Sequence, residues 1–211
     1  MRNPWDSLPR RAPYLLRLDA PYIRVHNQQK DLNEGHRIVL DEPPEPFLGP
    51  IDAPIVVLQL NPGVALGLKP RERHAVLTGL SDPQSITSHA LIEYRNTWWG
   101  RLIKSHTRDT PLGRIATRIQ SIEYFPYRST SFGFGHLRVP SQEFGFQLAR
   151  KALQRRAEIV ITRGARFWYG AVPELFENRQ VHVVKNLRSA SLSEANLGRK
   201  SFRRIRSALL D

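Results

Sequence analysis

The stretch Ile55-Val-Val-Leu-Gln-Leu-Asn61-Pro62-Gly63 decides the fold of this 211-residue chain. Its first residues are apolar and rich in β-branched side chains, and the apolar run ends abruptly at Asn61-Pro62-Gly63. Such a run predicts a buried strand, and the proline and glycine predict a rigid turn at its carboxyl end. Parallel α/β sheets carry their binding sites at that edge. Asn61 is therefore a candidate site residue, and a strand that ends in an ordinary turn is the alternative.

Strand and helix patterns alternate along the rest of the chain. Three further short apolar runs follow, at 119–125, 158–162 and 181–184. Helical patterns begin near residue 96 and recur at 141–156, 163–170 and 193–210. The clearest is 141–156, with Ser141 as its N-cap and apolar side chains on one face. This alternation predicts crossover connections, and hence an α/β fold with a mostly parallel sheet covered on both faces.

One domain accounts for most of the chain. The length fits a single domain with a substantial core. Residues 1–44 are predicted to form a polar N-terminal arm and a proline-stiffened connector, with a short helix at about 7–18 and an edge strand at 36–40. Residues 45–211 are predicted to form the α/β domain.

The composition excludes several classes of site. Because the chain has no cysteine, it has no disulfide, no thiolate zinc site, no cysteine-bound iron–sulfur cluster and no cysteine nucleophile. The seven histidines show no metal-binding spacing, so no metal site is expected. No apolar run is long enough to cross a membrane, and the first residues are not expected to act as a secretory signal. A cytoplasmic, monomeric protein without a membrane partner is expected.

The net charge of +13 is large for a domain of this size. A basic surplus favours polyanionic partners through counterion release, and arginine, which supplies most of it, suits phosphate. The sequence therefore predicts nucleic-acid binding, with the arginine-rich composition of a GC-rich genome as the alternative.

Asn61 is the candidate catalytic residue. A short amide at a strand end can hold a water molecule by hydrogen bonds without taking its proton outright. That role suits N-glycosidic cleavage, in which the sugar becomes strongly cationic and the position of the nucleophile matters more than basicity. Gln59 and Gly63 flank Asn61 and are expected to contact the substrate.

Two further segments supply candidate contacts to a base. Trp98 and Trp99 are adjacent on a predicted helix, where their side chains point about 100° apart. One is expected to pack inside and the other to stack on a base, with two core tryptophans as the alternative. Glu123 and Phe125 lie at the end of the second central strand. Glu123 is a candidate reader of a base edge, with a solvated or ion-paired carboxylate as the alternative.

The segment after the last predicted strand resembles an anion-binding corner. Small hydroxyls, backbone amides and a following helix N-terminus favour phosphate. The candidate DNA contacts are Asn186, Arg188, Ser189 and Ser191 in this loop and Arg199 and Lys200 at the start of the last helix. A solvated helix face is the alternative for the last two.

The order of these motifs resembles the uracil-DNA glycosylase superfamily, most closely its mismatch-specific uracil/thymine glycosylase branch. The resemblance rests on the turn at Asn61-Pro62-Gly63, the aromatic pair at Trp98-Trp99, the serine-rich loop at 186–193 and the final helix at 201–210, and it covers roughly residues 45–210.

The resemblance implies a three-layer α/β/α sandwich around a four-stranded parallel sheet. It implies hydrolysis of a base–sugar bond after the nucleotide is flipped out of DNA, without metal or organic cofactor. Asn61 would orient the attacking water, and the late loop would grip phosphates and fill the vacated stack. Where members often read uracil with an asparagine, the nearest polar residue here is Glu123. The target base therefore stays open, as does an alternative in which the fold binds nucleic acid without chemistry.

Overall fold

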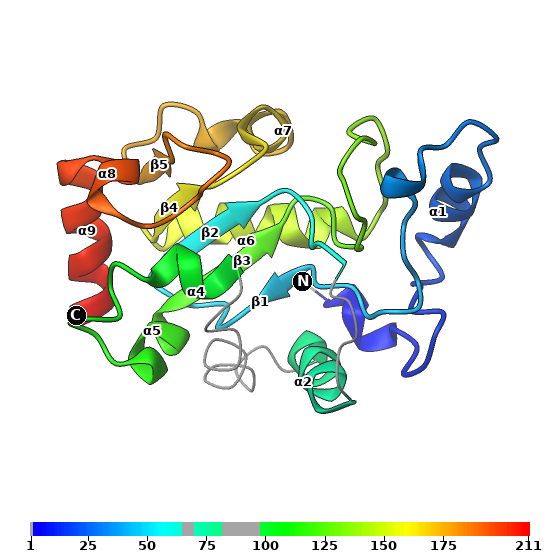
Figure 1. The fold of residues 1–211 in the computed structure, drawn as a ribbon, viewed down its shortest axis with the longest axis horizontal. Coiled ribbons are helices and arrows are strands. Elements are labelled where there is room, and N and C mark those ends of the chain that lie inside the picture. Colours follow the sequence, from blue (N-terminus) through cyan, green and yellow to red (C-terminus); the bar gives the residue numbers. More distant parts are fainter. Residues whose placement is uncertain (1, 65–69, 82–97) are drawn as a thin grey trace.

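The computed structural model describes residues 2–64, 70–81 and 98–211 and has an α/β fold (Figure 1). Its sheet has five strands in the spatial order β1-β3-β2-β4-β5. Their bounds are β1 Phe47–Leu48, β2 Ile55–Gln59, β3 Ile119–Glu123, β4 Glu158–Ile161 and β5 Val181–Val183. The four strands predicted from the sequence are all present, as β2, β3, β4 and β5, and they pair with one another in parallel.

The expectation of a four-stranded, purely parallel sheet is wrong in one respect. A fifth strand, β1, pairs antiparallel with β3 through Phe47↔Ile122 and Leu48↔Ser121, so the sheet is mixed. β1 is only two residues long and is followed directly by Gly49 and Pro50. A strand this short leaves no alternation of apolar and polar residues for a sequence pattern to detect.

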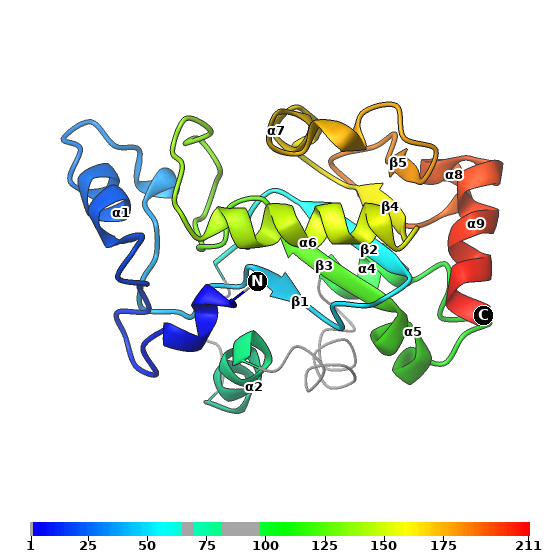
Figure 2. The ribbon, with the colours of Figure 1, turned by 180° about the vertical axis from the view of Figure 1, so that it is seen from behind.

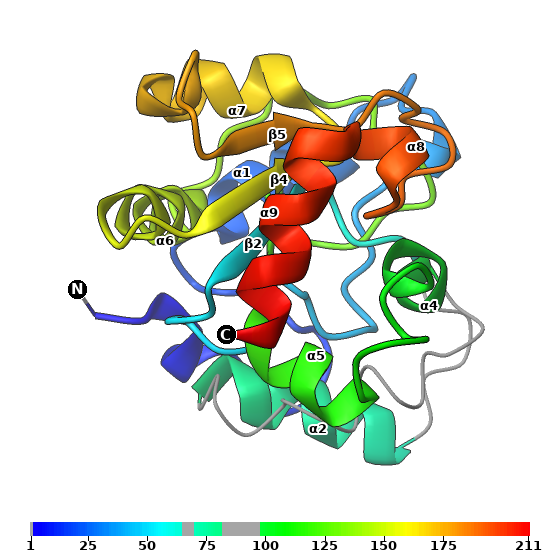
Figure 3. The same cartoon turned by 90° about the vertical axis from the view of Figure 1, so that its left-hand side faces the viewer.

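The central strand β2 has helices on both of its faces. Alternate side chains of a strand point to opposite faces, and β2 divides accordingly. Val56 and Leu58 pack in one apolar cluster with α6 (Gln142–Gln154) and α7 (Ala165–Ala171), whereas Ile55 and Val57 pack in another. The second cluster includes side chains of α4 (Trp98–Ile103), α5 (Leu112–Arg118) and α9 (Arg199–Leu210). Figure 2 shows α6 across the strands from behind, and Figure 3 shows α6 and α4 on opposite sides of them.

The three helices predicted after residue 140 are present, and two of them have different bounds because a glycine with positive φ interrupts the helix. The helix expected at 141–156 is confirmed as α6. The helix expected at 163–170 starts later, as α7, because Gly164 adopts a left-handed conformation with φ +70°. The helix expected at 193–210 is split into α8 (Glu194–Leu197) and α9, because Gly198 has φ +79°. The described residues also form η1 Pro4–Ser7, η2 Glu34–His36, α2 Pro70–Ser81 and η4 Pro173–Leu175.

The predicted helix at about 7–18 is wrong. The first α-helix is α1 (Ala20–Asn27), and residues 8–19 before it are not helical. Pro9 and Pro13 lie inside the expected span, and a proline in a helix interior removes a hydrogen bond and clashes with the preceding turn. Pro21 instead occupies the first turn of α1, where proline is tolerated.

The N-terminal segment packs into the same apolar cluster as β2. Trp5, Leu16 and Ile23 are buried there. The Tyr127 hydroxyl donates to Asp19 at 2.8 Å and accepts from the backbone N–H of Leu16 at 3.2 Å. Of the edge strand expected at 36–40, only an isolated bridge between Val39 and Arg128 is present. No helix in the described part of the chain is long and apolar enough to cross a membrane.

A largely buried ionic network fastens α9 to the sheet. Glu158 on β4 contacts His182 on β5 at 2.6 Å and accepts from Arg204 of α9 at 2.7 Å. The other ring nitrogen of His182 lies 2.9 Å from the hydroxyl of Ser201. Each of these four side chains therefore has a polar partner within the network, which is largely closed to water.

Replacing Glu158 by alanine is expected to lower the free energy of unfolding by about 1.5–3 kcal/mol, because it removes the carboxylate that the buried His182 and the half-buried Arg204 contact. Urea unfolding measures the change. Glu174→Ala is the matched control, because Glu174 pairs with Arg150 at 3.4 Å on the surface, and it is expected to cost under about 1 kcal/mol. Equal losses in the two variants would contradict a stabilising role for the network.

Candidate active site

The carboxyl edge of the sheet contains a topological switch point. The chain passes from β2 to β3 on one side of β2 and then crosses to β4 on its other side. In open α/β sheets, ligands bind outside the carboxyl ends of the strands where the chain reverses its direction in this way. Asn61 leaves β2 at this point, and Arg163 follows β4 at the same edge.

The side chain of Asn61 has a defined orientation. Its Nδ2 donates to the Ser129 hydroxyl at 2.8 Å and to the carbonyl of Pro62 at 3.2 Å. The Ser129 hydroxyl in turn donates to the carbonyl of Ser131 at 2.9 Å, so its oxygen must accept from Asn61. The amide oxygen Oδ1 therefore points away from Ser129, and within the described residues it has no hydrogen-bond partner. A half-buried amide oxygen fixed in this way can accept a hydrogen bond from a water molecule.

The segment that follows β3 holds the Asn61 turn in place. Arg128 is buried and donates to the carbonyl of Gly63 at 2.8 Å and to the carboxylate of Glu45 at 2.6 Å. The backbone N–H of Ser129 donates to the carbonyl of Pro62 at 3.3 Å. Arg128 and Ser129 were not among the residues expected from the sequence. Their only sequence signal is their position after Pro126, at the end of a strand.

Glu123 and Gln59 lie side by side at the same edge. They are partners in the parallel register of β3 and β2, so their side chains share one face of the sheet. Glu123 is 6% exposed, and its Oε2 has no hydrogen-bond partner in the described structure. Burial raises the pKa of Glu123 well above its ordinary value, and Glu45 raises it further, whereas Arg128 and Arg163 oppose the shift.

The raised pKa favours the neutral acid form of Glu123. A protonated carboxyl donates one hydrogen bond and accepts others, whereas a carboxylate only accepts. A Glu123 carboxylate would repel the carbonyl edge of a base, whereas a protonated Glu123 would not. Its burial supplies the physical reason for protonation.

The two tryptophans take different positions. Trp99 is buried in the second apolar cluster, with 7% of its surface exposed, and Trp98 is half-buried against it. Their rings lie 5.4 Å apart and nearly perpendicular. Trp98 is therefore the member of the pair with a surface available to a ligand. The preceding residues of the motif, 95–97, lie outside the described residues.

Two expected substrate contacts find little support in the structure. Phe125 is fully buried, with its ring 4.7 Å from that of Phe134 and 6.1 Å from that of Tyr127. Its side chain contacts the protein core, which corrects the expectation that it reaches a base. Gly63 is exposed, and a side chain added there would meet nothing within 4 Å, so no steric reason requires glycine.

The loop after β5 is shaped by two asparagines. The Asn186 Oδ1 accepts from the backbone N–H groups of Arg188 and Ser189 at 3.0 and 3.1 Å. Asn196 is buried, and its side chain contacts the loop through the N–H of Asn186 at 2.7 Å, the carbonyl of Ser189 at 3.1 Å and the hydroxyl of Ser191 at 3.3 Å. Asn186 and Ser191 therefore form the loop, and Asn196 is a positioning residue that sequence reasoning missed.

The tip of this loop is exposed and linked to β4. Leu187 is 50% exposed, and Arg188 and Ser189 are exposed beside it. The Arg163 side chain donates to the carbonyl of Leu187 at 3.2 Å. The expected phosphate contacts at Arg188 and Ser189 are therefore accessible, and an apolar side chain projects between Asn186 and Arg188.

Some basic side chains of α9 form ion pairs, and others have no charged partner among the described residues. Arg199 and Lys200 are exposed, and neither has a charged partner among the described residues. Arg206 instead pairs with Asp109 at 2.9 Å. No group of three or more histidine, aspartate or glutamate residues suited to a metal ion occurs in the described part of the chain.

Comparisons of the chain with protein-family models, with curated proteins and with solved structures find no match. Function is therefore inferred from the geometry of the carboxyl edge.

The raised pKa of Glu123 predicts a specific pH dependence of stability. Above the unfolded-state pKa of about 4.3, the folded protein binds one more proton than the unfolded chain, so this group lowers stability as the pH rises toward its folded pKa. Glu123→Gln removes the ionisation and keeps the shape. The variant is expected to match the unsubstituted protein near pH 4 and to be more stable at pH 8, by about 1 kcal/mol or more.

Urea unfolding at the two pH values measures the difference, with the exposed Glu143→Gln as the control. A Glu123→Gln variant whose stability relative to the unsubstituted protein does not change with pH would contradict the assigned environment.

Proposed function

We propose that the protein is a DNA glycosylase-like enzyme that hydrolyses the N-glycosidic bond of a flipped, damaged or mismatched base. The observation that carries the proposal is the orientation of Asn61 at the switch point. Its Nδ2 donates to Ser129, and its Oδ1 has no hydrogen-bond partner among the described residues. The resemblance to the mismatch-specific uracil/thymine branch of the uracil-DNA glycosylase superfamily gives the same residue this role.

In the proposed reaction, Asn61 positions a water molecule and does not remove its proton. The bond between the sugar C1′ and the base nitrogen breaks, and its electron pair leaves with the base. The water oxygen then forms a bond to the cationic C1′ and releases a proton to solvent. Because the sugar is already strongly electrophilic, an amide acceptor that fixes the nucleophile is sufficient.

Base recognition is assigned to the sheet face that carries Gln59 and Glu123. A neutral carboxyl and an amide each offer a donor and an acceptor, which suits the mixed edge of a nucleobase. The half-buried ring of Trp98 belongs to α4, which packs on this same face. It is the candidate stacking surface in place of Phe125.

The late loop is assigned to DNA. Arg188 and Ser189 are exposed for phosphate contacts, and Arg199 and Lys200 extend the cationic surface onto α9. Leu187, half exposed at the tip, suits insertion into the base stack, where apolar side chains of DNA-binding proteins occupy unstacked steps.

The second candidate function is a nucleic-acid-binding module without catalysis. It is favoured by the fact that the cationic surface of the late loop and α9 does not depend on Asn61. The two candidates differ in one result, which is the release of a base.

Base release from oligonucleotides tests the enzymatic proposal. The substrates are single strands and duplexes that contain uracil or hypoxanthine, and duplexes with thymine or uracil opposite guanine. Asn61→Ala is expected to reduce the rate about 100-fold or more, because it removes the group that places the water. Gln154→Ala, which removes an exposed amide on α6, is the control and is expected to leave the rate unchanged.

Release that survives Asn61→Ala undiminished would contradict the assigned mechanism. Salt-sensitive binding with no release from any of these substrates would favour the module without chemistry.

The salt dependence of DNA binding tests the assigned surface. Arg188→Gln and Lys200→Gln are each expected to lower the slope of log K against log salt by about 0.9, as each removes one phosphate contact. Lys151→Gln on α6 makes the same change in net charge on an exposed residue outside the assigned surface and is the control. The same change in slope for all three variants would contradict a localised interface.

A further inference from the structure

The end of the late loop (186–193) is joined to the helix that carries Trp98. Leu192 is fully buried, and its backbone N–H donates to the carbonyl of Leu102 at 2.8 Å. Leu102 lies in the last turn of α4, and the last carbonyls of a helix have no partner within it. Leu192 satisfies one of these carbonyls, so the backbone behind the loop tip is fixed to α4.

Two side chains from the turn after α4 bind the other polar group of Leu192. Its carbonyl accepts from Nε2 of His106 at 2.8 Å and from the hydroxyl of Ser105 at 3.1 Å. His106 is 3% exposed, and burial lowers its pKa, so the ring is neutral at neutral pH and carries one hydrogen. Because a carbonyl only accepts, this hydrogen is on Nε2.

The ring of His106 also contacts the helix that follows the late loop. It stacks on Phe202 of α9, with the ring centres 5.0 Å apart and an angle of 22° between the planes. One buried side chain therefore contacts both the late loop and α9 from the turn that ends α4. The base of the loop is held firmly, whereas Leu187 and Arg188 at its tip are exposed.

We propose that His106 is a positioning residue that holds the late loop to α4, so that Leu187 and Trp98 engage DNA at a fixed separation. The proposal rests on the function proposed above, in which Leu187 enters the base stack and Trp98 stacks on the flipped base. Trp98 precedes Leu102 by about one helical turn, or roughly 6 Å along α4. Two contacts that are already held in place need not be ordered when DNA binds, which lowers the entropic cost of binding.

Amide hydrogen exchange of the free protein tests the junction without DNA. His106→Phe keeps an aromatic ring beside Phe202 and removes the hydrogen that the Leu192 carbonyl accepts. Exchange at 186–193 is expected to accelerate about fivefold to tenfold, because the loop opens more often, while exchange in β2 and β4 stays unchanged. Ser105→Ala removes the second donor from an exposed position and is expected to act in the same direction, so the test survives if His106→Phe does not fold.

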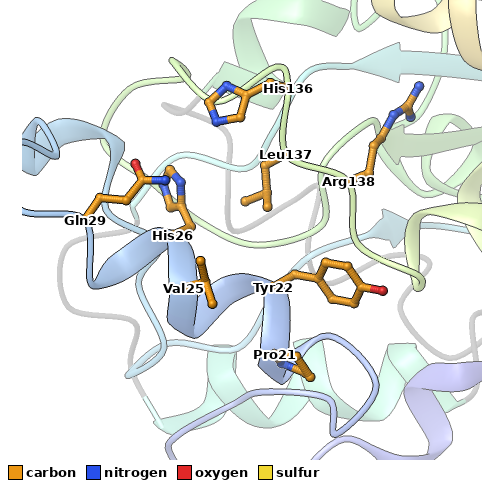
Figure 4. A pocket seen from close by; sticks show the side chains of 8 residues that line it. All are labelled: Pro21, Tyr22, Val25, His26, Gln29, His136, Leu137 and Arg138. Atoms are coloured by element: carbon orange, nitrogen blue, oxygen red, sulfur yellow. The ribbon is translucent and has the colours of Figure 1, made fainter.

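Two matched variants serve as controls. Thr107→Val removes a hydroxyl from the same turn, but this hydroxyl donates to the carbonyl of Lys104 at 3.0 Å and not to the late loop. His136→Phe makes the same change of ring at the end of the molecule that carries α1, where Figure 4 shows His136 at an open groove. Both variants are expected to leave exchange at 186–193 unchanged.

Binding to a duplex oligonucleotide with one abasic site tests the consequence for DNA. Leu187→Ala is expected to weaken binding about tenfold in the unsubstituted protein, because it removes the inserted side chain. In the His106→Phe background the same change is expected to weaken binding less than about threefold. Substitutions at independent, distant sites have additive effects, and a merely structural role of His106 would leave the factor for Leu187→Ala the same in both backgrounds.

Faster exchange at 186–193 together with a reduced effect of Leu187→Ala supports the proposal. Unchanged exchange in both His106→Phe and Ser105→Ala overturns it, and so does an equal effect of Leu187→Ala in the two backgrounds. If Leu187→Ala leaves binding unchanged even in the unsubstituted protein, the assigned DNA surface fails and the coupling fails with it. The exchange measurement then still shows whether His106 holds the loop, so the two failures are distinguishable.

Discussion

The parallel pairing of β2 with both neighbours is the constraint on which the rest of the structure depends. Every residue from Ile55 to Leu58 has a register partner on β3 and on β4, and all four are buried. Strands paired in this way end at a common edge, so the chain segments that leave them meet there. The position of Asn61 near Glu123 and Arg163 is therefore a consequence of register, because no local sequence motif brings these residues together.

Rigidity at this edge comes from groups remote in the sequence. Arg128 binds the backbone of the Asn61 turn and the carboxylate of Glu45, and Ser129 fixes the direction of the Asn61 amide. The buried carboxyl of Glu123 stands beside this rigid turn. Most buried polar groups in proteins are hydrogen-bonded, and exceptions commonly mark sites of strain or function. The edge therefore combines a firm scaffold with two polar atoms that lack partners among the described residues, Oδ1 of Asn61 and Oε2 of Glu123.

Much of the fold could be predicted from the sequence, and less of the site. The parallel strands and α6 were found because apolar periodicity over several residues reports burial directly. β1 was not predicted because a strand of two residues shows no periodicity. Its antiparallel pairing with β3 depends on the tertiary structure and not on the local sequence. Asn61 was found because it ends a strand, whereas Ser129 and Asn196 were missed because their roles depend on contacts across the fold. Phe125 was misjudged because a strand pattern does not show whether an aromatic ring ends in the core or in a pocket.

Amide hydrogen exchange of the whole chain, with and without duplex DNA, tests most directly whether the carboxyl edge is the nucleic-acid surface. The account predicts that DNA slows exchange both at 61–64 and at 186–191, and leaves the opposite edge at 49–54 and 155–157 unchanged. Protection confined to that opposite edge, or to only one of the two carboxyl-edge segments, would contradict it.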